Sequence, residues 1–420
     1  MSRIIGIDFG TTNSVLSVLE PDGSTTTAQF GPDHLATFRS VLCFWADEQG
    51  RQLQLKSAAG PAAIEAYLDD PLDSRLIMSM KSYLAQRSFT QTTLYGRAVT
   101  LEQLIAIFLR AFLAASNIAV EDAHIIAGRP VRFVGETADD ALGEQRLRDA
   151  FAQAGLTRID TALEPEAAGY RFARDLTAPA KVLIGDFGGG TSDFSIVRFD
   201  RGTVTPIATT GIGIAGDAFD FRIIDAVISP LLGKGDTYKV MKTALPVPPE
   251  YFSAFARWHR LSLMKAPKTL RAIAEVAKAA RHPERLLGLI SLIEDEMGYQ
   301  LYQVVSAAKA TLSRADHATL AFHHKNIHIH ETITRADFEA WIAPDIARMG
   351  ETVDQALALA NLPQSGIDHV FLTGGTSFVP AVRRLFETRF GHDRVSTGGE
   401  FVSVAEGLAL IGRDRAHALA

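Results

Sequence analysis

One phrase that the chain writes twice constrains its fold more than any other feature. "IIGIDFGTTNSVLSV" (4–18) and "VLIGDFGGGTSDFSIV" (182–197) each place an aspartate, Asp8 or Asp186, near the end of an apolar run, followed by a turn of small residues and a second apolar run. Two apolar runs joined by a tight turn are typical of a β-hairpin. Because about one domain length separates the two hairpins, the repeat predicts an internally duplicated molecule with two similar lobes.

A third phrase, "HVFLTGGTSFVPAVRRLFETRFG" (369–391), indicates a strand, a Gly-Gly-Thr turn and a helix. Elsewhere strand and helix periodicities alternate, which is typical of the α/β class. We expect helices at 101–118, 137–154, 217–229, 299–314, 335–360 and 378–390, and strands at 124–128, 181–186, 194–199, 204–210, 326–333 and 369–373.

The domain organisation follows from the repeat. We expect a first lobe at 1–175 and a second at 176–420, with the boundary near "RDLTAPAK". Residues from about 230 to 300 break the α/β rhythm and indicate an inserted helical subdomain, within which 257–285 carries eight Lys or Arg against two Glu. A solvated amphipathic face, packed together through Trp258 and nearby apolar residues, is the simplest interpretation. Binding of an acidic partner is the alternative, so this subdomain is the candidate surface for a protein partner.

Composition excludes several classes of protein. The 420 residues are 47% hydrophobic and 21% charged, the mixture of an ordinary globular chain, and the formal net charge of −6 gives no reason to expect nucleic-acid binding. A single cysteine, Cys43, excludes an internal disulfide and indicates a buried thiol. No secretory leader precedes the first strand, and the most apolar long segment carries Glu102 and Arg110. We therefore expect a cytoplasmic protein with no membrane partner.

The turns of the two hairpins have the residue types that a phosphate chain requires. Small residues let backbone N–H groups approach phosphate oxygens closely, and Asp8 and Asp186 at the strand ends are placed to hold a hydrated Mg²⁺. One such phrase alone would be an ordinary hairpin turn, but the second copy and the Gly-Gly-Thr turn favour phosphate binding. The candidate turn residues are Gly10, Thr11, Thr12 and Asn13, and Gly188, Gly189, Gly190 and Thr191.

These phrases resemble the nucleotide-binding domain shared by actin, Hsp70 and sugar kinases, and the wording is most similar to Hsp70. Further Hsp70-like phrases follow in the family's order: "LEPEAAGY" (163–170), "GDAFDFRII" (216–224), "ITRADFEAW" (333–341) and "FLTGGTSFVPAV" (371–382). The resemblance spans nearly the whole chain. It implies the actin-like ATPase fold, a ribonuclease H-like α/β architecture of two duplicated lobes around a central nucleotide cleft, with ATP or ADP and Mg²⁺ bound there.

The resemblance also implies residue roles. Asp8 and Asp186 would hold the water shell of the metal, and Thr11 and Thr191 would lie near the β- and γ-phosphates. Lys81, in "MSMKSYL", matches the lysine that reaches the γ-phosphate, although alone it would be interpreted as a solvated surface charge. Glu164 matches the acid associated with the metal-bound or attacking water. The implied catalytic residues are thus Asp8, Lys81, Glu164, Asp186 and Thr191.

On the adenosine side the chain both follows and departs from the family. Lys309 and Ser313 match ribose and adenine contacts, but Ser306, Ala310 and Phe378 stand where a glutamate and two arginines are usual, and Ala215 replaces a glycine. Phe378 either stacks on the purine or fills the pocket as core. The remaining nucleotide-binding residues that the resemblance implies are Gly216, Asp217, Gly374, Gly375 and Thr376.

The resemblance implies a slow ATPase that uses hydrolysis as a conformational switch. Hsp70 chains continue into a peptide-binding domain and a lid, whereas this sequence stops at "GLALIGRDRAHALA", so we expect no peptide groove and a likeness to the short YegD-type Hsp70-like proteins. Pro130 matches a family relay proline, although a strand-end role is favoured. Two alternatives stay open: a nucleotide-binding scaffold without turnover, and a phosphotransferase of the sugar-kinase branch.

Three other signals are weaker. "GIGIAG" (211–216) fits a dinucleotide fingerprint, but no acidic residue ends a second strand about 20 residues later. "DFG" (186–188) lacks the His-Arg-Asp phrase of protein kinases. In "HHKNIHIHETIT" (323–334), His328 and His330 alternate with isoleucines, which indicates the solvated face of a strand rather than a metal site.

Overall fold

The computed structural model describes residues 3–49, 52–134, 137–173, 176, 178–200, 203–256, 264–398 and 402–418. Its chain divides into two compact units, which are treated separately. Unit 1 comprises Met1–Gly216, Ala347–Phe378 and Val382–Ala420, and unit 2 comprises Asp217–Ile346 and Val379–Ala381. The expected boundary at residue 175 and Trp258 lie outside the described residues, and the two-lobe division stays a prediction.

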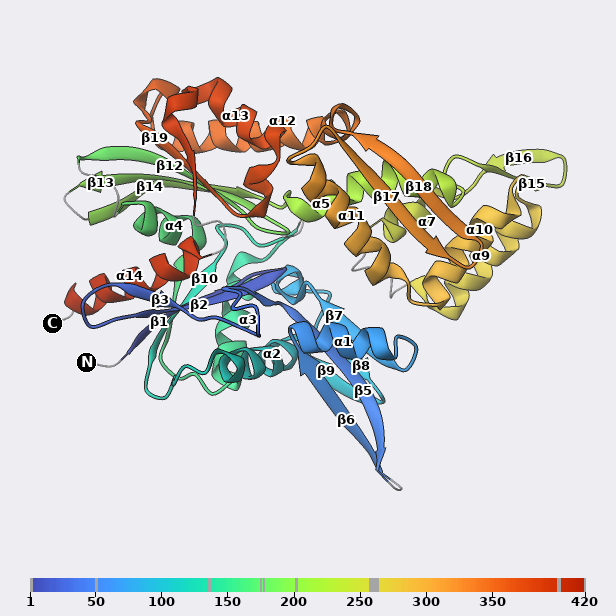
Figure 1. Cartoon of the computed structure of the whole chain (residues 1–420), viewed down its shortest axis with the longest axis horizontal. Helices are drawn as coiled ribbons and strands as arrows, with labels where there is room; N and C mark the ends of the chain where they lie inside the picture. Colours follow the sequence, from blue (N-terminus) through green and yellow to red (C-terminus); the bar gives the residue numbers. More distant parts are fainter. Residues whose placement is uncertain are drawn as a thin grey trace. The chain divides into compact units, whose positions relative to one another are not determined.

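Two sheets form the framework of unit 1 (Figure 1). The first has the order β11-β10-β1-β2-β3, with β4 also paired to β2, and the second has the order β14-β13-β12-β19-β20. The strands of the first sheet are β1 (Ile4–Phe9), β2 (Asn13–Leu19), β3 (Thr25–Thr27), β4 (Phe38–Arg39), β10 (His124–Arg129) and β11 (Ile159–Leu163). Those of the second are β12 (Ala180–Phe187), β13 (Ser192–Asp200), β14 (Thr203–Ile212), β19 (His369–Thr373) and β20 (Val395–Thr397).

The two sheets repeat one topology. In each, an antiparallel hairpin, β1–β2 or β12–β13, is extended on one side by a third strand and on the other by two parallel strands. The register of the second hairpin pairs Asp186 with Asp193, whereas the first pairs Asp8 with Val15. The internal duplication that the repeated phrase predicts is therefore present in the strand order.

Two helices lie between the sheets, and each follows one sheet in the sequence but packs on strands of the other. Helix α4 (Glu164–Ala173) follows the last strand of the first sheet and packs on β12 and β13, while α14 (Ser403–Ala418) follows the second sheet and packs on β1 and β2 (Figure 1). Glycines make this close packing possible: a Cβ on Gly407 would lie 1.7 Å from Ala167 O, and one on Gly6 would lie 2.1 Å from Ala405 O. The two sheets and the helix pair thus share a single apolar core.

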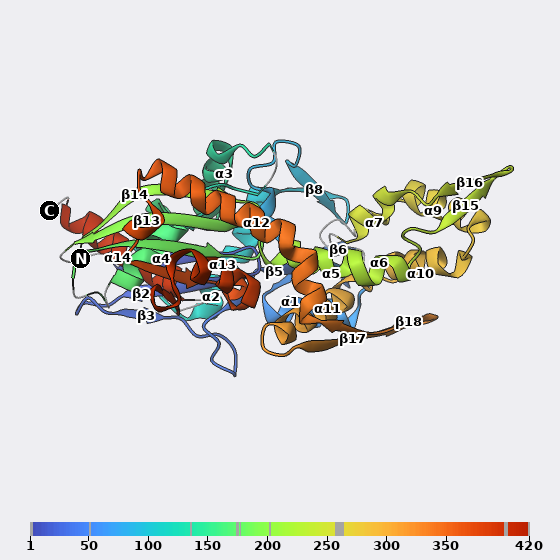
Figure 2. The ribbon, with the colours of Figure 1, turned by 90° about the horizontal axis from the view of Figure 1, so that it is seen from above.

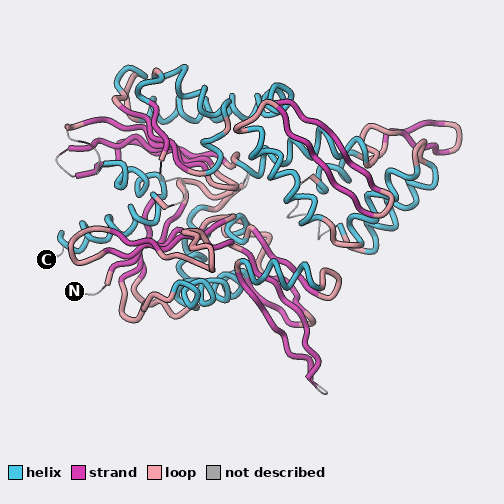
Figure 3. The backbone as a smooth tube through the Cα atoms, in the orientation of Figure 1, coloured by secondary structure: helices cyan, strands magenta, loops and turns pink. Residues whose placement is uncertain are grey.

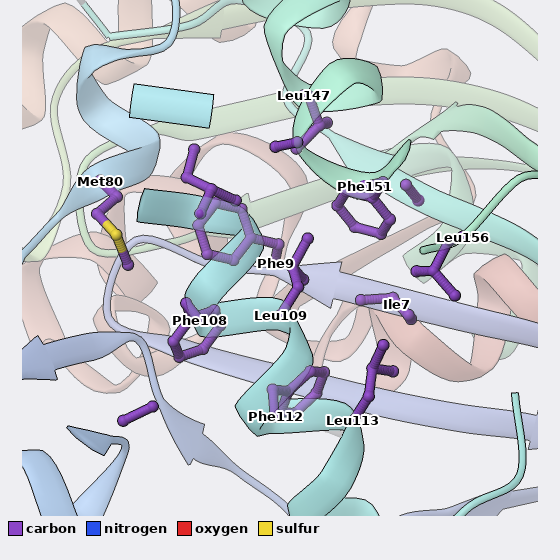
Figure 4. Close-up of a cluster of buried hydrophobic side chains, with 14 of the residues drawn as sticks. Ile7, Phe9, Met80, Phe108, Leu109, Phe112, Leu113, Leu147, Phe151 and Leu156 are labelled. Carbon is purple, nitrogen blue, oxygen red and sulfur yellow. The ribbon is translucent and has the colours of Figure 1, made fainter. Parts of the chain in front are cut away.

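Helices also cover the outer faces of both sheets. Figure 4 shows Phe9 of β1 against Phe108 of α2 (Leu101–Ser116), with ring centroids 5.5 Å apart, and Phe151 of α3 (Asp140–Gln153) in the same cluster. On the second sheet, Phe386 of α13 (Pro380–Phe390) contacts the rings of β12 and β13, and α12 (Arg335–Leu359) accepts a hydrogen bond from β14. Because helices cover both faces of each sheet, the central strands β1, β2, β12 and β13 are buried along most of their length.

Smaller elements extend unit 1 from the first sheet. A three-stranded sheet with the order β6-β5-β7 packs against α1, and β8 and β9 form a hairpin. A 3₁₀ turn at Met80–Tyr83 follows β7 and carries Lys81. The elements are β5 (Val41–Gln49), β6 (Gln52–Ala59), α1 (Pro61–Asp69), β7 (Ser74–Met78), β8 (Gln91–Leu94) and β9 (Arg97–Thr100).

Unit 2 is mainly helical, with two hairpins. Helix α11 packs on β17, while α9 packs on α10 and on β15, and Figure 2 shows the β15–β16 hairpin extending beyond α9. The helices are α5 (Gly216–Ile223), α6 (Ser229–Leu231), α7 (Pro249–Phe255), α9 (Pro267–Ala279), α10 (Pro283–Glu294) and α11 (Gly298–Leu312). The strands are β15 (Thr237–Val240), β16 (Thr243–Pro246), β17 (His317–His324) and β18 (Ile327–Thr334).

Most local predictions are confirmed. Each predicted strand and helix is present within three residues of its predicted ends, although the segment predicted as one helix at 217–229 is interrupted by a π-helical turn at Ile224–Ile228 (the tube in Figure 3 shows the secondary structure). Cys43 is buried, and His328 and His330 are exposed next to the buried Ile327 and Ile329. Among the described helices, none combines the length and apolar character needed to cross a bilayer.

Candidate phosphate-binding site

The turn of the β1–β2 hairpin holds the first group of predicted residues. Asp8 is the penultimate residue of β1, Gly10, Thr11 and Thr12 form the turn, and Asn13 opens β2 and accepts a hydrogen bond from Arg39 at 3.2 Å. A Cβ on Gly10 would lie 2.1 Å from Asn13 O, so the turn needs glycine there.

The β12–β13 turn has a similar construction, and the Gly-Gly-Thr turn of residues 374–376 packs against it. Gly188 N–H donates to Thr191 O at 2.9 Å, which closes the turn that holds Gly189 and Gly190. Gly374 has φ of +86°, and a Cβ there would lie 2.1 Å from Phe187 O. Thr376 Oγ1 donates to Gly188 O at 3.5 Å. The Gly374, Gly375 and Thr376 turn therefore packs directly on the second hairpin turn.

Gly190 shows that the two hairpin turns meet. A Cβ at this position would lie 3.8 Å from Thr11 Oγ1 and 3.7 Å from Ser82 Oγ. The first turn, the second turn and the 3₁₀ turn that carries Lys81 thus border one small region. The sequence repeat predicts the first two of these segments, whereas the third was found only through the family phrase.

Lys81 and Glu164 form a buried ion pair inside this region. Lys81 Nζ lies 2.5 Å from Glu164 Oε1 and 4.0 Å from Asp8 Oδ1, and less than a tenth of either Lys81 or Glu164 is exposed. Glu164 is the first residue of α4, and Gly128 in β10 leaves room for it, since a Cβ there would lie 3.1 Å from Glu164 Cγ. Lys81, which without the family resemblance would be interpreted as a surface charge, is therefore buried and paired with Glu164, the predicted catalytic acid.

The region that the turns border contains more carboxylates than basic side chains. Burial, and then the neighbouring Glu164, raise the pKa of Asp8 to about 7, and burial with the surrounding carboxylates raises the pKa of Asp186 well above its usual value. Burial alone would lower the pKa of Lys81, but Glu164 and Asp8 reverse this and raise it. One lysine does not compensate these carboxylates, so the region favours an added cation or protons.

Sequence analysis missed Asp193. This residue pairs with Asp186 across the hairpin, is almost fully buried, and accepts a hydrogen bond from Val131 N–H at 3.0 Å. Burial, and then Glu164, raise its pKa to about 7. Hairpin register could have revealed it, because cross-strand partners share one face and Asp186 and Asp193 lie symmetrically about the glycine turn.

The residues present fit a hydrated divalent cation. Asp8, Asp186 and Asp193 are hard oxygen donors whose pKa values are raised by burial and then by neighbouring carboxylates, so a cation would stabilise their charged forms. Within the described ranges, no group of three or more His, Cys, Asp or Glu side chains is arranged to hold a metal ion. Binding through water, as the sequence predicts for Asp8 and Asp186, is consistent with both observations.

The predicted adenosine-side residues are divided between the units. Phe378 belongs to unit 1 and is 42% exposed, and Gly216 ends that unit's first segment. Asp217, Lys309 and Ser313 belong to unit 2, where Lys309 Nζ pairs with the buried Asp220 at 2.8 Å and Ser313 Oγ donates to Lys309 O. Asp220 was not predicted.

Comparisons with known proteins identify the family. A model of the Hsp70 protein family matches residues 139–237 and 289–413, together more than half of the chain. The chaperone protein DnaK of Cyanidioschyzon merolae is 25% identical over 93% of this chain, and DnaK proteins of Deinococcus deserti and Deinococcus radiodurans are 25% identical over 98% of it. The chain spans 58% of the length of each of these relatives. This chain therefore belongs to the Hsp70 family and has that family's actin-like ATPase fold.

Proposed function

We propose that this Hsp70-family chain binds Mg-ATP between its two hairpin turns and hydrolyses it slowly, with hydrolysis acting as a conformational switch. Family membership supports a chaperone-type nucleotide-binding ATPase. The observation that carries the finer proposal is the buried Lys81–Glu164 pair, which lies beside Asp8 in the region that the two hairpin turns border.

The turns would bind the phosphate chain. Backbone N–H groups at Gly10 and Thr11 on one side, and at Gly189 and Gly190 on the other, can donate to phosphate oxygens because no side chain blocks the glycines. The hydroxyl groups of Thr11 and Thr191 would supply further donors. Mg²⁺, when bound by Asp8 and Asp186 through water, would neutralise charge on the phosphates.

The ion pair would carry the chemistry. Lys81 would donate to the γ-phosphate oxygens and would also hold Glu164 in position, which the 2.5 Å contact between Lys81 Nζ and Glu164 Oε1 supports. A carboxylate held in this way can accept a hydrogen bond from a water and orient it for in-line attack. Because Lys81 and Glu164 are both buried, their interactions act in a region of low dielectric, where they stabilise developing charge more than in bulk water.

The position of the site supports a switch role. The turns belong to two repeated sheets joined by the α4–α14 pair, so loss of a bound γ-phosphate would remove a bridge between the two hairpins. Residues 230–300 are the proposed surface for a protein partner, and a cytoplasmic location is proposed on the sequence alone.

The test combines a binding titration with a single turnover. Calorimetric titration with Mg-ATP and Mg-ADP measures binding, and radiolabelled ATP with protein in excess measures phosphate release. We expect slow release that an Asp186→Ala variant lacks. Tight binding without release would instead establish the scaffold alternative.

A phosphotransferase is separated from an ATPase by a screen of phosphoryl acceptors. Glucose, glycerol and other hydroxyl compounds are added in turn while ATP consumption is followed. We expect consumption to be independent of the acceptor. A strong rise with one acceptor would replace the hydrolysis proposal by the sugar-kinase alternative.

A further inference from the structure

Two exposed surfaces, one in each unit, take no part in the candidate site. The first, here called the hairpin surface, consists of Lys239, Val240, Met241, Lys242 and Leu245 on β15 and β16. Met241 is 98% exposed and has φ of +55°, a backbone conformation that apolar side chains rarely adopt. An apolar residue that is both strained and fully exposed at a hairpin tip suggests a function rather than a folding role.

The hairpin surface is basic. Residues 237–246 include no carboxylate, and the hairpin is anchored beside the end of α9, where Arg281 N–H donates to Thr237 O at 2.8 Å. Lys239, Lys242 and Arg281 form no ion pair with any residue that the structure describes. Figures 1 and 2 both show this hairpin at the end of unit 2, beyond α9. Positive charge therefore surrounds an exposed apolar tip.

The second surface, here called the acidic loop surface, lies at the end of α1 in unit 1. It consists of Leu68, Asp69, Asp70, Leu72 and Asp73, together with Tyr95 from the β8–β9 turn. Tyr95 Oη donates to Asp73 O at 2.5 Å, and Asp73 N–H donates to Asp70 Oδ1 at 3.2 Å, so the group is held together.

This surface has the opposite charge and the same apolar character. Residues 65–73 contain four carboxylates and no basic residue. The exposed fractions of Leu68, Leu72 and Tyr95 are 44%, 62% and 43%. Within the described chain, neither Asp69 nor Asp70 has an ion-pair partner. Four carboxylates thus lie beside this apolar group, and Arg75 and Arg97 are the nearest basic residues in the sequence.

We propose that the hairpin surface of one copy binds the acidic loop surface of a second copy. Exposed apolar groups rimmed by one sign of charge mark interaction sites, and opposite charges favour this partner over others. A second copy of this chain is the partner that fits, because every copy carries both complementary surfaces. The contact is head-to-tail, so it leaves one surface of each kind free at the ends and permits chains of copies.

The experiment is sedimentation equilibrium of the full chain over a wide range of concentration and salt. We expect weak, concentration-dependent association that added salt reduces, since exposed charges are screened. The double substitution Lys239→Glu and Lys242→Glu is expected to raise the dissociation constant at least about tenfold. The double substitution Asp69→Lys and Asp70→Lys should raise the dissociation constant by a similar factor.

The decisive experiment is sedimentation equilibrium of a mixture of the two charge-reversed proteins. Each protein then offers its partner a complementary pair of surfaces, so association of the mixture is expected to return although neither protein associates alone. Lys268→Glu, in the first turn of α9 and away from the hairpin, is the matched control and should change nothing. Melting curves establish that every variant is folded. Sedimentation as one copy at all concentrations, or a mixture that does not associate, would overturn the proposal.

Discussion

Lys81 has two carboxylate partners, the buried Glu164 and the partly exposed Asp8, and its substitution separates chemistry from binding. We predict that Lys81→Met lowers the single-turnover rate of ATP hydrolysis about 100-fold, because a preorganised donor to the γ-phosphate is lost. Nucleotide affinity should change much less, since the glycine turns are intact. Rapid-quench phosphate release and calorimetry measure the two quantities, and Lys325→Met, an exposed lysine of unit 2, is the control. An equal loss of affinity and rate would refute a role specific to hydrolysis.

We expect the Asp193 carboxyl to lower the free energy of unfolding at neutral pH, although it lies in the candidate site. Its folded pKa of about 7 exceeds the ordinary aspartate pKa of 3.8, so the folded state loses stability as the pH rises through that interval. Asp193→Asn removes this loss and keeps an acceptor for Val131 N–H. We predict a gain of about 1 kcal/mol in the free energy of unfolding at pH 8 and none below pH 4.

The measurement for Asp193→Asn is urea unfolding of the nucleotide-free protein at several pH values, with Mg-ATP binding followed in parallel. We expect binding to become less dependent on Mg²⁺ as stability rises. A variant that is less stable than wild type at pH 8 would show that Asp193 is a structural acceptor only.

At the residue scale, the sequence predicted the parts of the site that repeat. Asp8, Asp186 and both glycine turns follow from the two similar phrases. Lys81 emerged only through the family resemblance, because a lone lysine between Met80 and Ser82 gives no sign of burial. Asp193 was missed because the first hairpin has Val15 at the corresponding position, so the repeat itself concealed it.

At the scale of elements, the α4–α14 contact sets the spacing of the two sheets. Gly407 lies against Ala167 O, and an added methyl group must displace one of the helices. We predict that Gly407→Ala lowers the free energy of unfolding by about 2 kcal/mol, although alanine favours helix formation. Thermal unfolding checks this. Gly398→Ala, whose methyl group would be 3.7 Å from Phe371, should be nearly neutral, and equal effects of the two changes would contradict the packing argument.

In unit 2 the β17–β18 hairpin is tied to the end of α10 by one carboxylate. Burial raises the pKa of Asp295, but hydrogen bonds from Lys325, His324 and Ser291 outweigh this and lower it to about 2. A lowered folded pKa gives stability above the unfolded value that is lost as the pH falls toward 2. Since Asp295 is partly exposed, we predict that Asp295→Asn costs only about 1 kcal/mol at pH 7 and little at pH 2.

Urea unfolding at pH 7 and at low pH tests the Asp295 prediction. Glu331→Gln, an exposed carboxylate on β18, provides the control. A cost that is the same at both pH values would mean that the amide disturbs packing and that the charge is unimportant.

Elements were more predictable than their arrangement. Strands and helices follow from local apolar periodicity, which the chain contains within each segment. The exchange of α4 and α14 between the repeats depends on contacts between residues far apart in sequence, such as Ala167 with Gly407, and no local pattern contains them. The π-helical turn after α5 likewise has no periodic signature.

At the scale of the whole molecule, family membership and strand order agree. An Hsp70 family model matches residues 139–237 and 289–413, which include the second hairpin, and the two sheets share one topology. What the comparisons leave to experiment is whether this chain itself turns over ATP, because its relatives are 25% identical and it spans 58% of their length.

The most direct measurement is a single turnover of ATP in ¹⁸O-labelled water with protein in excess, analysed by the mass of the released phosphate. We predict that phosphate appears slowly with one labelled oxygen atom, that it requires Mg²⁺, and that Asp186→Ala abolishes it. Unlabelled phosphate, a phosphorylated acceptor in its place, or bound ATP that stays intact would contradict hydrolysis by water at the paired hairpins.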